Sequence, residues 1–82
     1  MRASLVHSSM TVVIFYTNIT AEHDVQRLAP ALENIPGIIR WTVDLDDSDK
    51  VLRVVALSDI ASDILQLLQA HGYCGWNVPV NV

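Results

Sequence analysis

The chain of 82 residues has little basic charge, a single cysteine and no long apolar run. Five Lys and Arg against nine Asp and Glu give a formal net charge of −4, which leaves few side chains to neutralise phosphates and argues against a nucleic-acid partner. Cys74 alone excludes an intrachain disulfide and is typical of a reducing compartment, so we expect a cytoplasmic protein. No stretch is long enough to span a membrane, and residues 1–9 lack the apolar run of a secretory signal.

The chain also lacks the groupings of side chains that catalysis requires. It has three glycines and no Gly-rich phosphate loop, and Ser58, Ser62 and His71 do not have the spacing of a triad. We therefore expect a protein that is not an enzyme. Apolar residues make up 51% of the sequence, which favours a packed core over disorder. This length suffices for one small domain, which we expect over residues 10–82. Because Met10 immediately precedes the first strand-like run, we expect residues 1–9 to be a flexible leader.

Hydrophobic periodicity predicts both strands and helices. Strands are expected at residues 11–17, 39–45, 51–57 and 73–80, and helices at residues 21–34 and 59–71. Thr20 is the expected N-cap of the first helix, and Ser58 or Asp59 that of the second. Leu28 and Leu67 lie on the apolar stripes of these helices, so we expect both to be core residues.

The predicted order βαββαβ is that of a ferredoxin-like α+β sandwich, with two helices on one face of a four-stranded antiparallel sheet. The strand at 39–45 is expected at an edge. The loops at 17–24, 46–50 and 71–75 should meet at one end of the sheet. Because residues 11–17 are apolar on both parities, the sheet face opposite the helices should carry apolar side chains, a surface for a protein partner or for self-association.

Three segments, LAPALENIPGI, WTVDL and LLQAHGY, resemble the packing motifs of the heavy-metal-associated domain, the fold of copper chaperones and of the N-terminal modules of metal-transporting ATPases. In the family that the chain resembles, a Met-x-Cys-x-x-Cys loop follows the first strand, and its two thiolates hold a soft ion such as copper(I). Counting back from Pro36 places Ile19 at the Met position, and Ala21 and Asp24 at the two cysteines. The resemblance therefore implies a binding or interaction domain without the thiolate pair. It also implies that the Ile19 side chain packs in the core, as the Met side chain does in the family.

Four other side chains near the shared loop end are candidate metal ligands: His23, Asp24, His71 and Cys74. Imidazole, thiolate and carboxylate together suit zinc or copper. The alternative is structural, with His23 solvated in the first helical turn, His71 at a helix C-terminus and Cys74 a small buried hydrophobe. The sequence leaves open a domain without a cofactor, a divergent zinc or copper carrier, and a small-ligand sensor of the same βαββαβ order.

Aspartates cluster between the second and third expected strands, at Asp44, Asp46, Asp47 and Asp49. Several carboxylates together are typical of calcium sites. A calcium loop would need a Gly at the bend and a bidentate Glu, but Val55 occupies the position of that Glu. The cluster therefore predicts a solvated hairpin turn.

Overall fold

The computed structural model describes residues 10–79, and the expected leader over residues 1–9 lies outside this range, as do residues 80–82. The elements follow in the order β1 (Thr11–Thr17), α1 (Glu22–Glu33), β2 (Ile38–Asp44), β3 (Val51–Ala56), α2 (Ala61–Ala70) and β4 (Gly75–Val78). This confirms the predicted βαββαβ order, and each boundary lies within two residues of the expected one.

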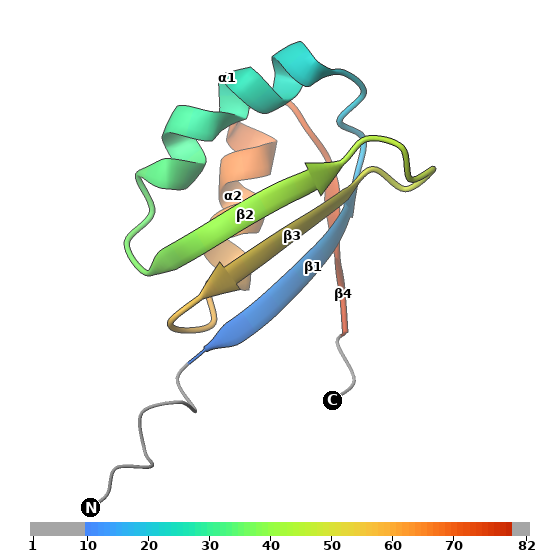
Figure 1. The fold of residues 1–82 in the computed structure, drawn as a ribbon. Helices are drawn as coiled ribbons and strands as arrows, with labels where there is room; N and C mark the ends of the chain where they lie inside the picture. Colours follow the sequence, from blue (N-terminus) through green and yellow to red (C-terminus); the bar gives the residue numbers. More distant parts are fainter. Residues whose placement is uncertain (1–9, 80–82) are drawn as a thin grey trace, which may run out of the picture.

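The four strands form one antiparallel sheet in the order β2-β3-β1-β4. β1 is therefore a central strand, which explains its apolar residues on both parities, and β2 lies at an edge as expected. Both helices pack on the same face of the sheet (Figure 1), which confirms the ferredoxin-like sandwich. We call the opposite sheet face, which faces the viewer in Figure 1, the open face.

The core lies between the helices and the sheet face that they cover. Phe15 of β1 is fully buried there, together with Leu28 and Leu32 of α1. Ile19, just beyond β1, is also fully buried, so it fills the core as the resemblance implied. The expected burial of Leu28 is confirmed.

The buried stripe of α2 consists of Ile60, Ile64 and Leu68, which recur every four residues. Leu67, which we expected on this stripe, is only half-buried, because one residue turns the helix by about 100°. It lies instead beside Ile35 at a surface hollow between the two helices. Leu67 therefore packs against the margin of the core and is not one of its fully buried residues.

The ends of α2 show how the chain enters and leaves this helix. Ile60, and not Ser58 or Asp59, is the N-cap residue. Asp59 still contributes, because its Oδ1 accepts a hydrogen bond from the N–H of Ala61 at 3.0 Å. At the other end Gly72 has a φ of +87°, a left-handed conformation that favours glycine and ends the helix.

Candidate functional site

The loop end of the sheet is joined by backbone hydrogen bonds, as the sequence predicted for its three loops. The N–H of Thr17 donates to the carbonyl of Asp49 at 3.0 Å, and the N–H of Asn18 donates to the carbonyl of Cys74 at 3.3 Å. The side-chain Oδ1 of Asn18 in turn accepts the N–H of Cys74 at 2.8 Å. The end of β1 is therefore hydrogen-bonded both to the β2–β3 hairpin and to the loop before β4.

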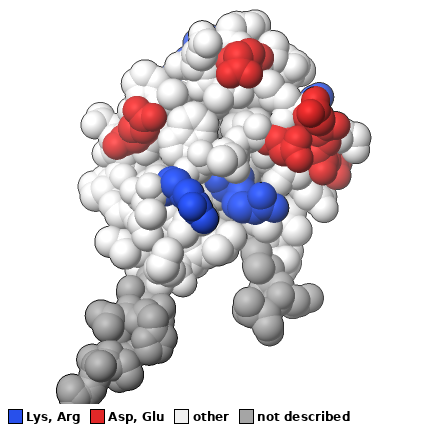
Figure 2. Space-filling view, in the orientation of Figure 1, with Lys and Arg blue, Asp and Glu red and all other residues white. Residues whose placement is uncertain are grey.

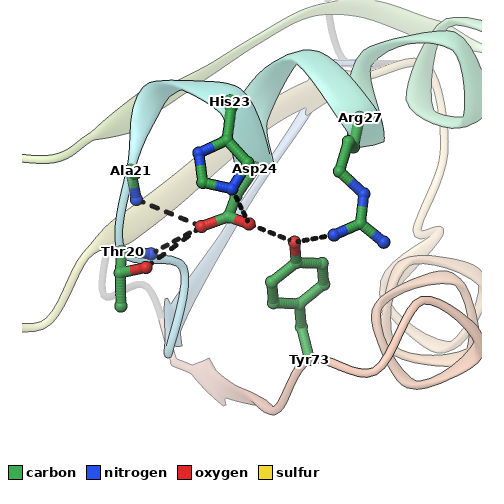
Figure 3. A network of polar contacts seen from close by, with 6 residues as sticks. All are labelled: Thr20, Ala21, His23, Asp24, Arg27 and Tyr73. Atoms are coloured by element: carbon green, nitrogen blue, oxygen red, sulfur yellow. Dashed lines mark hydrogen bonds and ion pairs between the residues drawn. The ribbon is translucent and has the colours of Figure 1, made fainter.

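Asp24 lies at the centre of this loop end (Figure 3), at the position where the resembled family has its second cysteine. Although it carries a carboxylate, it is only 7% exposed. Its Oδ2 accepts hydrogen bonds from the N–H of Thr20 at 3.3 Å, the hydroxyl of Thr20 at 3.1 Å and the N–H of Ala21 at 3.2 Å. Its Oδ1 accepts a hydrogen bond from the hydroxyl of Tyr73 at 2.6 Å. Both carboxylate oxygens are thus occupied by donors of the chain itself.

These contacts correct the predicted start of α1. The helix begins at Glu22 with Ala21 as its N-cap, one residue later than the Thr20 cap predicts. Ala21 has no side-chain oxygen, so Asp24, the third helical residue, reaches back to the amides of Thr20 and Ala21. This is the reciprocal half of a capping box, in which the acidic residue satisfies donors outside the first turn. The hydroxyl of Thr20 donates to Asp24 instead of accepting from the helix.

Tyr73 connects the loop after α2 to the first turn of α1. Besides donating to Asp24, its hydroxyl oxygen accepts a hydrogen bond from Nη1 of Arg27 at 3.5 Å. The Nε2 of His23 lies 3.5 Å from Oδ1 of Asp24, and the His23 side chain is 72% exposed. The phenol and the carboxylate therefore form the centre of a polar joint between segments 49 positions apart, with Arg27 and His23 at its solvent side (Figure 3).

The joint changes the acidity of both central groups. The hydrogen bond from Tyr73 is the main cause that lowers the pKa of Asp24 from 3.8 to about 2; burial opposes this, and the donors on Thr20 and Ala21 add to it. The same hydrogen bond raises the pKa of Tyr73 above 10, because the phenolate would lose its bond to the carboxylate. At neutral pH the joint holds a carboxylate and a neutral phenol.

The predicted metal ligands other than Asp24 point to solvent. His71 is the exposed C-cap residue of α2, with its Nδ1 3.0 Å from the carbonyl oxygen of Leu67. Cys74 is exposed, which corrects the alternative of a buried hydrophobe. Among residues 10–79, no group of three or more His, Cys, Asp or Glu side chains is placed to hold a metal ion. The ligand set of His23, Asp24, His71 and Cys74 stays a prediction for a binding measurement to test.

From the sequence Asp24 was a candidate ligand, and its contacts with Tyr73 and its proximity to Arg27 were not predicted. The contact between Asp24 and Tyr73 could have been predicted, because Tyr73 falls in the loop at 71–75 that was expected to meet the loop of Asp24. A buried carboxylate needs hydrogen-bond donors, and a phenol in an adjoining loop is a natural one.

The acidic hairpin between β2 and β3 uses its carboxylates to hold the turn. Oδ1 of Asp44 accepts the N–H of Asp46 at 3.1 Å, and Oδ1 of Asp47 accepts the N–H of Asp49 at 2.8 Å. Lys50, which follows them, has a φ of +48°. These are turn contacts of the kind that aspartate favours, as expected for a solvated hairpin.

The pKa of Asp24 predicts how stability falls in acid. A folded pKa below the unfolded value means that this carboxylate stabilises the fold above about pH 4, and that the contribution is lost as the pH falls toward 2. In Tyr73→Phe the pKa of Asp24 should return toward 3.8, so this variant should be less stable than the unmodified protein at pH 6 and should lose less on acidification. Thermal melting at several pH values measures this. Parallel curves for the two proteins would contradict the assigned cause.

No protein-family model matches the chain, and comparison with curated proteins finds no match either. Solved structures do resemble it. The N-terminal domain of ZntA in its Zn(II) form is 18% identical, with 88% of this chain and 97% of that one covered and a TM-score of 0.75. The copper(I)-loaded first domain of the human copper chaperone for SOD1 is 17% identical, with coverage of 88% and 97% and a TM-score of 0.71. The apo HMA domain of a copper chaperone for superoxide dismutase is 16% identical, with coverage of 89% and 71% and a TM-score of 0.70.

These likenesses confirm that the chain has the fold of heavy-metal-associated domains, as its packing motifs indicated. At such low identities they establish the fold and leave the chemistry to the residues of this chain. Neither helix in the described part of the chain is long and apolar enough to cross a membrane.

Proposed function

We propose that this chain is a non-enzymatic, cytoplasmic interaction domain that has the heavy-metal-associated fold but does not carry copper(I) as its cargo. In this proposal the loop after β1 is a structural joint, and the protein acts through contacts of its open face with a protein partner. The observation that supports the proposal is the state of Asp24. It stands where the second thiolate is expected, and both its oxygens accept hydrogen bonds from the chain itself.

The donor set of the chain also argues against a copper(I) cargo. Copper(I) is a soft ion that prefers thiolate and thioether ligands. The chain contains one cysteine, Cys74, and two methionines, of which Met10 lies before β1. A single exposed thiolate offers one soft ligand, half of the pair that holds copper(I) in the resembled family.

A divergent zinc or copper carrier remains a second candidate. It is favoured by the 3.5 Å separation between His23 and Asp24 and by the position of Cys74 at the same end of the sheet. Two of the similar solved structures are described as Zn(II) and copper(I) forms. A metal bound to Oδ2 of Asp24 would displace donors on Thr20 and Ala21, which costs free energy, whereas Oδ1 accepts a hydrogen bond from Tyr73 alone and lies beside His23. The small-ligand sensor stays a prediction that no particular contact favours.

Metal titration of the reduced, tag-free protein, followed by native mass spectrometry, tests the proposal. We expect neither copper(I) nor zinc to bind better to the folded protein than to the same chain unfolded in urea. Stoichiometric binding to the folded protein alone, weakened sharply in both His71→Ala and Cys74→Ser, would overturn the proposal in favour of the carrier. The control variant Ser62→Ala, on the exposed side of α2, should leave the titration unchanged in either case.

A further inference from the structure

The open face is divided into an apolar part and a charged part. β4 and β1 contribute exposed or half-exposed apolar side chains, and β2 contributes polar ones. The exposed fractions are 62% for Trp76, 40% for Tyr16 and 43% for Val12, which is high for apolar side chains on a sheet. Figure 2 shows basic side chains near the middle of this face and acidic ones toward its rim, although the chain as a whole is acidic.

The strand register arranges the open face in three rows across the sheet. From β4 to β2, one row consists of Trp76, Tyr16, Val51 and Asp44, the middle row of Val78, Ile14, Arg53 and Thr42, and the last row, from β1 to β2, of Val12, Val55 and Arg40. The first row, next to the loop end, finishes in an acidic residue on β2. The last row finishes in a basic residue on the same strand.

This arrangement is complementary to itself. A two-fold axis lying along the middle row, across the strands, would place each strand over its own copy in the opposite direction. Asp44 would then face Arg40 of the second copy, and Arg40 would face its Asp44, while Tyr16 would face Val12 in the same reciprocal way. Self-complementarity of one patch is the requirement for an isologous dimer. Two sheets can pack face to face in this aligned manner, with side chains interdigitating.

We infer that the open face binds a second copy of this chain, as a face-to-face dimer in which Asp44 and Arg40 form reciprocal ion pairs across the axis. The inference rests on the proposed function, which makes this face the contact surface, and it adds the identity of the partner. Apolar side chains of β1 and β4 supply the buried area of the contact. The two ion pairs fix its direction, because a two-fold axis running along the strands would place β2 of one copy over β4 of the other and leave Asp44 and Arg40 without partners of opposite charge.

The size of the face predicts a weak dimer. Four strands spaced about 4.8 Å apart span about 19 Å, and three rows along the strands span about 17 Å. A face of this size falls short of the roughly 800 Å² per partner of a standard interface. Arg53, in the middle row, also meets its own copy near the axis, which opposes association. We therefore expect a dissociation constant on the order of 100 μM.

Sedimentation equilibrium at protein concentrations from about 5 to about 500 μM tests the dimer, since this range brackets the expected dissociation constant. Variants that reverse or exchange the charges at positions 40 and 44 test the ion pairs. Arg40→Asp and Asp44→Arg should each weaken association about tenfold or more, because each brings like charges together twice in one dimer. The double variant Arg40→Asp with Asp44→Arg exchanges the two charges and should restore association. Asp63→Arg makes the same charge change on α2, away from the open face, and should associate like the unmodified protein.

Circular dichroism on each variant verifies that it folds, which separates a lost interface from a lost fold. A protein that stays monomeric over the whole range, or a dimer that the charge exchange does not rescue, would overturn the inference. Those results are independent of the metal titration. Absence of a dimer together with absence of metal binding would leave the interaction domain with a different partner, whereas metal binding by a monomer would overturn both proposals.

Discussion

The variant Ala21→Cys with Asp24→Cys is expected to bind one copper(I) ion tightly, where the unmodified protein binds none. The two positions have the Cys-x-x-Cys spacing of the resembled family, and they lie at the N-cap and in the first turn of α1. The positive end of the helix dipole lowers the pKa of thiols placed there, so both would be thiolates near neutral pH. Two thiolates on one loop are the ligand pair that a soft ion prefers.

The same substitution weakens the polar joint, because the single sulfur of a cysteine at position 24 cannot replace both oxygens with which Asp24 accepts hydrogen bonds from Tyr73 and the loop amides. The metal-free variant should therefore melt at a lower temperature than the unmodified protein, and copper(I) should raise its melting temperature. Titration against a copper(I) chelator of known affinity measures the binding.

The matched control is Asp24→Ser with Ala21 unchanged, which loses the carboxylate of the joint and supplies no thiolate. It should be destabilised and should gain nothing from copper(I). Each single cysteine variant, made together with Cys74→Ser so that it carries a lone thiolate, should bind weakly. A folded double-cysteine variant that fails to bind copper(I) would mean that the loop end differs from the resembled site in more than its two ligands.

Leu28→Ala is expected to destabilise the domain by about 2–5 kcal/mol, because it leaves a cavity under α1. Leu28 is 1% exposed and belongs to the core cluster with Phe15 and Leu32. A domain of this length has a total stability of only about 4–12 kcal/mol, so the variant could be largely unfolded at ambient temperature. Urea denaturation followed by circular dichroism gives the free energy of unfolding.

Leu67→Ala deletes the same atoms from α2 and is the matched control. Because Leu67 is half-buried at a surface hollow, its loss should cost clearly less than that of Leu28. Equal losses for the two variants would show that the hollow is part of the core in solution.

The fold could be predicted from the sequence because its signals are local and repeated. Alternation along β2, the β-branched residues of β1 and two helical stripes fix the element order, and right-handed crossovers leave few ways to assemble it. The burial of individual side chains was harder to predict, because it changes from one helical residue to the next. Leu67 and Leu68 are both leucine, and only the helical phase set by Ile60 and Ile64 decides that Leu68 is the buried one.

The candidate site was harder to predict than the fold, because its central contact joins distant parts of the chain. The sequence placed Asp24 and the loop of Tyr73 at the same end of the sheet, but it did not show that their side chains meet. The residue pattern was compatible both with a capped helix start and with a set of metal ligands. Only the hydrogen-bond partners of the Asp24 carboxylate in the structure distinguish the two interpretations.

The position of β1 has a consequence for how this chain folds as it is synthesised. β1 comes first among the elements, yet its two neighbours in the sheet are β3 and β4, and β4 is the last element of all. One edge of β1 therefore has no native partner until residues 75–78 have been made, and until then its backbone groups are open to pairing with other nascent chains. The final four-residue strand adds the edge that covers β1, so a chain halted before Gly75 should be prone to aggregation despite already containing both helices.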